Sequence, residues 1–265
     1  SKTQMSKLSL RKIKAYKNSD KLVMITAYDY LFAKLFNKNV EMILVGDSLN
    51  MSFGGQKDTL NASLDVMIYH TKAVCMGAPD TFVVCDMPFG SYVNEEVALK
   101  NALRIYQESD ADAVKVEGGV QKAGVVKALT DNGIAVVGHI GLLPQFFRSE
   151  GYAIKGKDES SSDELIADAK AIEAAGAFCI VIEGVKADVA QKISQAISIP
   201  TIGIGAGNGT DGQVLVWSDM LGLFEDFTPK FVRKYLDGAK LVKSAISHYS
   251  RDVRSGEFPN SNESY

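Results

Sequence analysis

The amino-acid sequence predicts an α/β fold, a single (β/α)8 barrel, and three observations support this prediction. Eight short runs rich in Val and Ile recur along the 265 residues. Their apolar residues are nearly continuous rather than alternating, which is typical of strands buried on both faces of a parallel sheet. Helical patterns separate most of the runs, and no linker or change of composition divides the chain. This alternation favours one closed barrel over a doubly wound open sheet.

The predicted strands are short, and most of them are separated by enough chain to hold a helix. They occupy residues 23–29, 42–48, 82–88, 113–119, 135–141, 178–184, 201–207 and 213–219. The last two are exceptions, because only the sequence GNGTDG connects them. The seventh helix of the barrel is therefore expected to be short or missing.

Capping residues mark the starts of the predicted helices. Ser63, Asn94 and Ser162 stand where helices are expected to begin, and Gly176 stands where one is expected to stop. Acidic residues follow Asn94 directly, which suits the positive end of a helix dipole. The helices are expected at 63–78, 94–111, 161–177 and 186–197.

The ends of the chain are predicted to belong to the same domain, residues 1–265. Residues 1–20 are expected to form a helical extension that packs through Leu8, Ile13 and Tyr16. A final helix is expected at 229–253, with an apolar face made of Phe231, Leu236, Leu241 and Ile246. Residues 254–265 are expected to form a frayed tail. The long connection 141–161 is rich in Gly, Ser and Lys, which indicates a mobile loop over the site.

Composition narrows the class of protein. A net charge of −3 and a pI near 5.7 provide no basic surface for nucleic acid or an anionic membrane. No apolar run approaches the roughly 20 residues that span a bilayer. The three cysteines have no metal-binding spacing, and their odd number argues against a disulfide framework. We therefore expect a protein of the reducing cytoplasm without structural zinc.

Four of the predicted strands end in a carboxylate, and this is the main functional signal. The residues are Asp47, Asp86, Glu117 and Glu183. A buried carboxylate is costly unless a partner offsets its desolvation. In a (β/α)8 barrel the active site lies at the carboxyl ends of the strands, so these four acids can converge there. For any one of them, a simple role as a helix cap is the alternative.

A divalent cation would relieve the repulsion among these acids. Oxygen ligands without cysteine indicate magnesium rather than zinc, and Mg²⁺ takes one or two carboxylates directly. We expect Asp47 and Asp86 to bind the metal directly, and Glu117 to bind it directly or through water. Glu183 is then free to act as a base.

Other polar side chains share the same end of the barrel. Lys115 and Glu117 are two residues apart on one strand and must lie on the same face. A buried lysine there suits a negatively charged substrate. Ser48, Tyr28 and His139 are possible supporting residues, although a histidine inside a strand can also be a satisfied core residue. His70 and His248 are expected to be structural or solvated.

Several segments together resemble the ketopantoate hydroxymethyltransferase family. They fall in the same order over residues 22–235, most of the chain, and four motifs combine at successive strand ends: GDS, DMPF, K-x-EGG and GHIGL. The segments are TAYDYLFAKLF, ILVGDSLNM, CDMPFGSY, VKVEGG, GHIGLLPQ and IGIGAGNGTDGQVLV. This combination is highly specific.

The resemblance implies a Mg²⁺-dependent barrel that uses 5,10-methylenetetrahydrofolate. Such an enzyme transfers a hydroxymethyl unit to 3-methyl-2-oxobutanoate through a Mg-stabilised enolate, in pantothenate and coenzyme A biosynthesis. It also implies a cytoplasmic homo-oligomer, a homodecamer, whose small-molecule partners are the 2-oxo acid and the folate.

Each site residue matches a family position. By resemblance Asp47, Ser48, Asp86 and Lys115 hold the 2-oxo acid. The resemblance also implies that Asp47, Asp86 and Glu117 form the metal group and that Glu183 accepts the proton.

Four departures from the family and two rival readings stay open. The family often has Gly at Asn50 and a histidine near Gln56, it usually has Thr at Leu143, and Cys often follows the base where Gly184 stands. Leu143 and Gly184 lie near the expected site, so they affect substrate placement or rate. One rival is a non-catalytic barrel that binds a keto acid or a folate, but the loss of a charged site residue that would mark it is not seen. The nearer rival is a Mg-dependent 2-oxo acid lyase or mutase of the isocitrate lyase and phosphoenolpyruvate mutase type. The sequence shows no KKCGH-like motif for such a lyase, and this favours the transferase.

Overall fold

The computed structural model describes residues 6–265, so residues 1–5 of the predicted N-terminal extension lie outside the description. The chain divides into two compact units, one ending at Val216 and the other spanning Trp217–Tyr265. Each unit is described by itself below.

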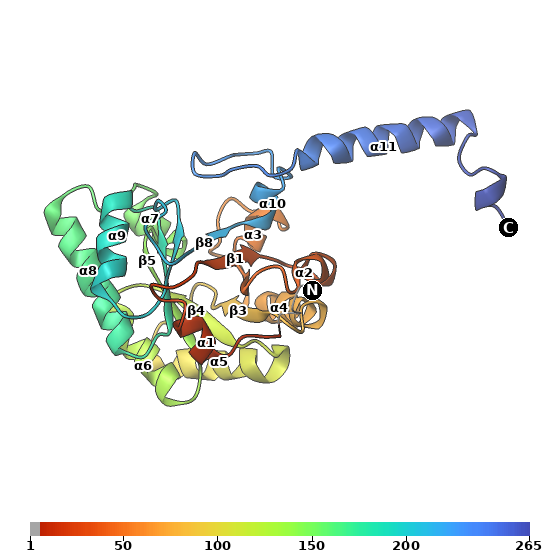
Figure 1. Cartoon of the computed structure of the whole chain (residues 1–265). Coiled ribbons are helices and arrows are strands. Elements are labelled where there is room, and N and C mark those ends of the chain that lie inside the picture. Colours follow the sequence, from red (N-terminus) through yellow and green to blue (C-terminus); the bar gives the residue numbers. More distant parts are fainter. Residues whose placement is uncertain (1–5) are drawn as a thin grey trace. The chain divides into compact units, whose positions relative to one another are not determined.

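The first unit is a closed barrel of eight parallel strands in sequence order (Figure 1), which confirms the predicted fold class. Each predicted run overlaps one strand, and β1 and β8 begin one residue before the predicted bounds. The strands are β1 (Leu22–Thr26), β2 (Met42–Val45), β3 (Phe82–Asp86), β4 (Ala113–Glu117), β5 (Val136–Gly141), β6 (Cys179–Glu183), β7 (Thr201–Ile204) and β8 (Gly212–Leu215). No helix lies between β7 and β8, as the short connection predicts.

Helices of the first unit surround the strands, and two of them begin at the predicted caps. The side chain of Ser63 accepts from Val66 N at 3.2 Å, and that of Asn94 accepts from Val97 N at 2.9 Å. The helices are α1 (Leu10–Lys14), α2 (Tyr30–Phe36), α3 (Leu49–Ser52), α4 (Leu64–Gly77), α5 (Glu95–Ser109), α6 (Ala123–Asp131), α7 (Phe147–Glu150), α8 (Glu159–Ala174) and α9 (Ala187–Ala196). The sequence did not predict α2, α3, α6 or α7, and most of these are too short to show a helical period.

The predicted cap of α8 is wrong. Asp158 caps this helix instead of Ser162, because its Oδ1 accepts from Ser161 N at 2.7 Å. An aspartate at this position also suits the helix dipole. Ser162 consequently lies inside the first turns, and α8 begins at Glu159. Gly176 follows the end of the helix with φ of +110°, a backbone conformation that favours glycine.

A cluster of apolar side chains fills the barrel on the amino-terminal side of the polar strand ends. It includes Met24, Leu44, Phe82, Val84 and Val181 from alternate positions of the strands, and Ile13 from α1 is fully buried against it. Leu8 and Tyr16 are partly buried against the same cluster, as predicted. Since side chains alternate along a strand, the next inward positions toward the carboxyl ends are Asp86 and Glu183. The apolar core and the polar site therefore form successive layers inside the barrel.

The second unit contains α10 (Trp217–Met220), α11 (Gly238–Ser255) and a 3-10 turn, Ser261–Glu263. The predicted helix 229–253 begins nine residues late, at Gly238. The reason is a set of backbone hydrogen bonds within this unit: Tyr235 N donates to Met220 O at 2.8 Å, and Gly238 N donates to Leu221 O at 2.9 Å. These bonds hold residues 229–237 in a non-helical path. The predicted tail, 254–265, contains the end of α11 and the 3-10 turn.

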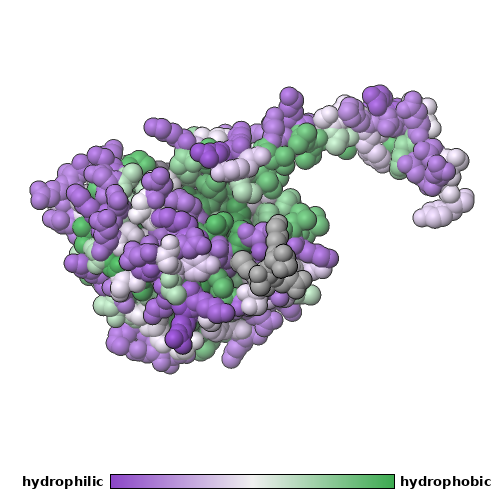
Figure 2. Space-filling model, in the orientation of Figure 1, coloured by the Kyte–Doolittle hydropathy of each residue, from purple (hydrophilic) through white to green (hydrophobic). Residues whose placement is uncertain are grey.

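The surface of α11 carries both polar and apolar side chains, and Figure 2 shows hydrophilic residues along much of its visible face. Leu241, Val242, Ile246 and Tyr249 are exposed on it. Among the residues that the structure describes, no helix is long and apolar enough to cross a membrane.

Candidate active site

Five neighbouring strands bring the predicted polar residues together at their carboxyl ends. The register pairs Asp86 with Lys115 across β3 and β4, and Glu117 with His139 across β4 and β5. Glu183 pairs with Gly141 across β5 and β6. Asp47 lies two residues after the end of β2. All four acids predicted from the strand ends thus lie at one end of the barrel.

Asp86 and Lys115 form a buried ion pair. Lys115 Nζ lies 3.1 Å from Asp86 Oδ1, and both side chains are less than a tenth exposed. The other oxygen, Asp86 Oδ2, accepts from the backbone N of Asp47 at 3.0 Å. Burial acts to lower the pKa of Lys115, but the carboxylates of Asp86, Glu117 and Asp47 outweigh it and raise that pKa. Lys115 therefore stays positively charged in the interior.

His139 connects Lys115 to Glu183. Its Nδ1 lies 2.6 Å from Lys115 Nζ, and its Nε2 lies 3.0 Å from Glu183 Oε2 and 3.1 Å from Leu142 O. A charged lysine has only donors, so Nδ1 must accept and the ring proton must be on Nε2. Burial and the charge of Lys115 lower the pKa of His139 well below its usual value, which keeps the ring neutral. The Nε2–H group therefore donates toward Glu183.

Gln145 connects Asp47 to Glu117, and sequence reasoning missed it. Its Nε2 donates to Asp47 Oδ2 at 2.8 Å and to Met87 O at 3.0 Å, and its backbone N donates to Glu117 Oε2 at 3.0 Å. It lies in the 3-10 turn η2 (Pro144–Phe146), in the loop that the sequence predicts to be mobile. The GHIGLLPQ segment that carries the family resemblance contains it, and this was the available signal.

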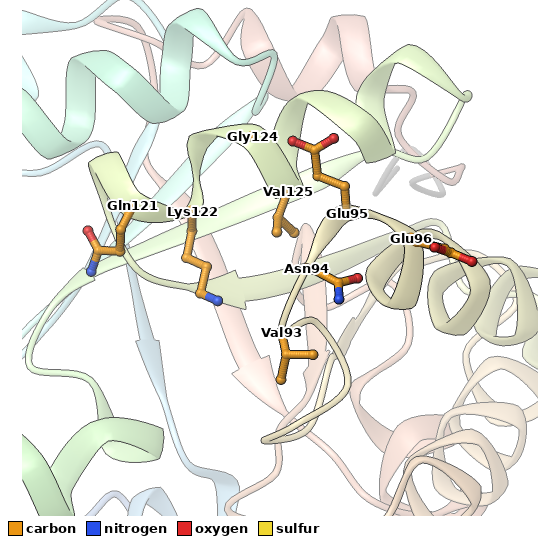
Figure 3. A pocket seen from close by; sticks show the side chains of 8 residues that line it. All are labelled: Val93, Asn94, Glu95, Glu96, Gln121, Lys122, Gly124 and Val125. Carbon is orange, nitrogen blue, oxygen red and sulfur yellow. The ribbon is translucent and has the colours of Figure 1, made fainter.

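Tyr92 completes the contacts of Gln145 and was also missed. Its hydroxyl donates to Gln145 Oε1 and accepts from Glu117 N at 3.1 Å. Behind Tyr92, a separate surface pocket of about 470 Å³ opens between the starts of α5 and α6 (Figure 3). Lys122 lines this pocket and donates to Tyr92 O at 3.3 Å. The pocket contains none of the predicted site residues.

Burial raises the pKa of three of the acids. That of Glu183 rises to about 7 and that of Glu117 to about 8, in both cases mainly through desolvation. The pKa of Asp47 rises well above its usual value because of burial and then the charges of Asp86 and Glu117. Ionising all of them at neutral pH is therefore unfavourable without a positive partner.

Tyr28 and Ser48 lie together at the edge of this group. Their hydroxyl oxygens are 2.6 Å apart, and His70 Nδ1 lies 2.6 Å from Tyr28 O. A Cβ placed on Gly46 would lie 3.0 Å from Ser48 Oγ and 3.6 Å from Asp86 Oδ2. Ser48 and Asp86 are thus close neighbours across this glycine, and His70 has the structural role that the sequence suggests.

The two departures from the family that lie near the expected site have different surroundings. Gly184 has φ of +58°, and a Cβ there would lie 3.1 Å from Leu142 Cβ. Leu143 is buried directly before η2. Both therefore border the Gln145 turn rather than the ion pair of Asp86 and Lys115.

The donors present fit a magnesium ion held by two carboxylates. Asp86 Oδ1 is buried and accepts no hydrogen bond of good geometry, and Asp47 receives one only on Oδ2. Mg²⁺ binds through one or two carboxylates and keeps several waters. Within residues 6–265 no three His, Cys, Asp or Glu side chains are arranged to hold a metal together. Oε2 of Glu117 accepts from Gln145 N.

The fold and the site define a class of protein, a (β/α)8-barrel enzyme with buried carboxylates and a lysine at the active-site end. The ketopantoate hydroxymethyltransferase family model matches residues 7–261. The chain belongs to this family. A 3-methyl-2-oxobutanoate hydroxymethyltransferase of Aliarcobacter butzleri is 60% identical over 265 residues, which cover all of this chain and 98% of that protein. One of Nitratiruptor sp. is 63% identical over 253 residues, 96% of each chain.

Solved structures with a similar fold have other activities. A phosphonopyruvate hydrolase complex with oxalate and Mg²⁺ has a TM-score of 0.63 at 13% identity, covering 98% of this chain and 93% of that one. A 2,3-dimethylmalate lyase of the PEP mutase/isocitrate lyase superfamily has a TM-score of 0.61 at 14% identity, covering 97% and 91%. Identities this low show a shared fold alone. The structures therefore support the rival lyase or mutase interpretation only as a relationship of fold.

Proposed function

We propose that this protein is a 3-methyl-2-oxobutanoate hydroxymethyltransferase that transfers a one-carbon unit from 5,10-methylenetetrahydrofolate to give ketopantoate and tetrahydrofolate. Family membership, with relatives of about 60% identity along the whole chain, carries this proposal. The contact between Glu183 and His139 beside a buried lysine supports the chemistry.

The substrate is a small anion, and Lys115 with Ser48 is suited to hold it. The lysine is kept charged inside the barrel, so it attracts the carboxylate of a 2-oxo acid. Ser48 supplies a hydroxyl beside Asp86, and Tyr28 fixes the position of that hydroxyl. Because water is largely excluded here, each of these contacts orients the substrate more strongly than it would at the surface.

The metal site of this proposal consists of Asp47 and Asp86, with Glu117 acting through water. Mg²⁺ bound there would polarise the keto group and make the C3 proton more acidic. This chain's own part is to align the two carboxylates through Gln145 and Lys115. A phosphonopyruvate hydrolase of similar fold was solved in a complex with oxalate and Mg²⁺, which suits this proposal.

Glu183 is the base of the proposed reaction. A pKa of about 7 makes the carboxylate basic enough to take a proton near neutral pH while leaving much of it ionised. His139 donates to the carboxylate and so fixes which of its lone pairs face the substrate. After Glu183 has taken the C3 proton, C3 bonds to the methylene carbon of the folate while the bond from that carbon to one folate nitrogen breaks. Water then displaces the second nitrogen, which leaves the hydroxymethyl group on C3 and releases tetrahydrofolate.

Two further parts of the proposal follow the family. We place the protein in the cytoplasm, because a reducing compartment keeps thiols free. Cys75, Cys85 and Cys179 are all free cysteines. We also propose a homo-oligomer, with the homodecamer of the family as the expected form. The folate and the 2-oxo acid are its expected small-molecule partners, and pantothenate biosynthesis is its expected pathway.

The test is an assay of ketopantoate formation with purified protein, Mg²⁺ and 3-methyl-2-oxobutanoate, with methylenetetrahydrofolate supplied or withheld. We expect product only when the folate is present. Cleavage of 2-oxo acid substrates without folate would instead support the lyase reading. A protein that binds the keto acid and turns over neither way would contradict both.

A further inference from the structure

We propose that Gln145 is a positioning residue, whose amide and backbone N–H groups hold Asp47 and Glu117 in the arrangement that receives the divalent cation. This inference rests on the proposed function, because the cation belongs to that reaction. It adds a residue to the site that no comparison assigns, and one that lies on a loop rather than on a strand.

One residue contacts both carboxylates by two different groups. The side-chain Nε2 donates to Asp47 Oδ2 at 2.8 Å, and the backbone N donates to Glu117 Oε2 at 3.0 Å. Gln145 itself is only 3% exposed. Hydrogen bonds from a neutral donor to an ionised carboxylate are shorter and stronger than those between two neutral groups. The contacts therefore fix which carboxylate oxygens remain for other ligands.

The orientation of the amide is determined by its neighbours. Glu117 N donates to Tyr92 Oη at 3.1 Å, so the hydroxyl proton of Tyr92 must point to Gln145 Oε1. Both hydrogens on Nε2 are then used, one toward Asp47 Oδ2 and one toward Met87 O at 3.0 Å. Every polar atom of the Gln145 side chain thus has a partner, and a flipped amide would place an acceptor against the carboxylate of Asp47.

The consequence for the metal is direct. With Oδ2 of Asp47 engaged by Gln145, Oδ1 is the oxygen left to face a cation. Oδ1 of Asp86, which accepts no hydrogen bond of good geometry and has only the charge of Lys115 at 3.1 Å, is the second oxygen available. With Oε2 of Glu117 engaged as well, this third acid is held at the side of the site. Removal of a residue that hydrogen-bonds to a ligating carboxylate usually lowers the affinity for the metal about 10–100-fold.

Gln145→Met and Gln145→Glu test the proposal. Methionine keeps the length of the side chain but removes the donor, and glutamate replaces the donor by an acceptor that repels Asp47. The exposed Gln107→Met on α5 is the matched control. The primary measurement is the Kd of the purified full chain for Mn²⁺. The concentration of free Mn²⁺ is read from its electron paramagnetic resonance signal.

We expect the Kd for Mn²⁺ to rise about 10–100-fold in Gln145→Met and at least as much in Gln145→Glu, with no change in the control. Tyr92→Phe is the second arm, because it keeps the aromatic ring and removes the hydroxyl that orients the amide and accepts from Glu117 N. We expect a smaller rise in Kd for this variant. The KM for the 2-oxo acid should rise with the metal Kd in all three.

A purely structural role would give a different result. It would lower the melting temperature equally with and without Mn²⁺ and leave the Kd unchanged. Folded Gln145→Met and Tyr92→Phe variants that bind Mn²⁺ as the wild type does would overturn the proposal. Wild-type protein that forms product but binds no Mn²⁺ would also overturn it, and wild-type protein that binds Mn²⁺ but forms no ketopantoate would count against the proposed function instead.

Discussion

The proposed role of Glu183 as the base leads to a prediction that separates proton removal from binding. Glu183→Gln keeps the size of the side chain, and its amide oxygen can still accept from His139 Nε2, which lies 3.0 Å from the present carboxylate oxygen. The amide cannot take a proton. We therefore expect the variant to bind the 2-oxo acid and Mg²⁺ while exchange of the C3 proton with deuterated water falls by about 10²–10⁴-fold.

The pH profile of the wild-type protein gives a second, quantitative part of the same prediction. Burial raises the pKa of Glu183 to about 7, and only the ionised carboxylate can act as a base. The ionised fraction is then about 0.9 at pH 8 and about 0.1 at pH 6. Exchange in the wild type should accordingly rise about tenfold from pH 6 to pH 8 and level off above that.

The assay follows the loss of the C3 proton signal of 3-methyl-2-oxobutanoate by proton NMR in deuterated water, without folate. Glu164→Gln, an exposed glutamate on α8, is the matched control. If Glu183→Gln exchanged the C3 proton at the rate of the wild type, another group would have to be the base. A wild-type rate that does not change between pH 6 and pH 8 would contradict the assigned pKa.

Three further predictions concern the ion pair, the core and the metal. Lys115→Met should lower the free energy of unfolding by about 3–5 kcal/mol, measured by urea denaturation, because it leaves Asp86 buried without its partner; an unchanged value would show that the pair contributes no stability. Ile13→Ala should lower the same free energy by about 2–5 kcal/mol, since Ile13 is fully buried in the core of the barrel. A loss below about 1 kcal/mol would mean that the packing of α1 on the core contributes little stability. Removal of divalent ions with EDTA should abolish ketopantoate formation and added Mg²⁺ should restore it, whereas activity that survives EDTA would contradict the metal-dependent proposal.

The strands and their polar ends could be predicted because the relevant information is local. A run of Val and Ile that is buried on both faces shows itself in the sequence, and the period of two then decides that Lys115 and Glu117 share one face. Helix caps such as Ser63 are equally local, since the side chain bonds to a backbone N–H three residues away. The family resemblance added the reaction, which these patterns alone do not contain.

The second unit shows where local patterns fail. The apolar spacing of residues 229–253 is helical throughout, yet α11 begins only at Gly238. Tyr235 and Gly238 donate their backbone N–H groups to Met220 O and Leu221 O, so they do not take part in a continuous helix from residue 229. Hydrogen bonding to another segment outweighs helical propensity here, and propensity is a weak force in comparison.

By itself the sequence determined the barrel, the positions of its strands and the four acids at their ends, because each depends on residues that are neighbours in the chain. Only the tertiary structure decided how those acids are held. Gln145 and Asp47 are 98 residues apart, and their hydrogen bond exists only because the barrel closes and the loop after β5 returns over its end. In the sequence, this glutamine is one more polar residue in a loop that looked mobile, and burial between two carboxylates is what gives it a proposed role.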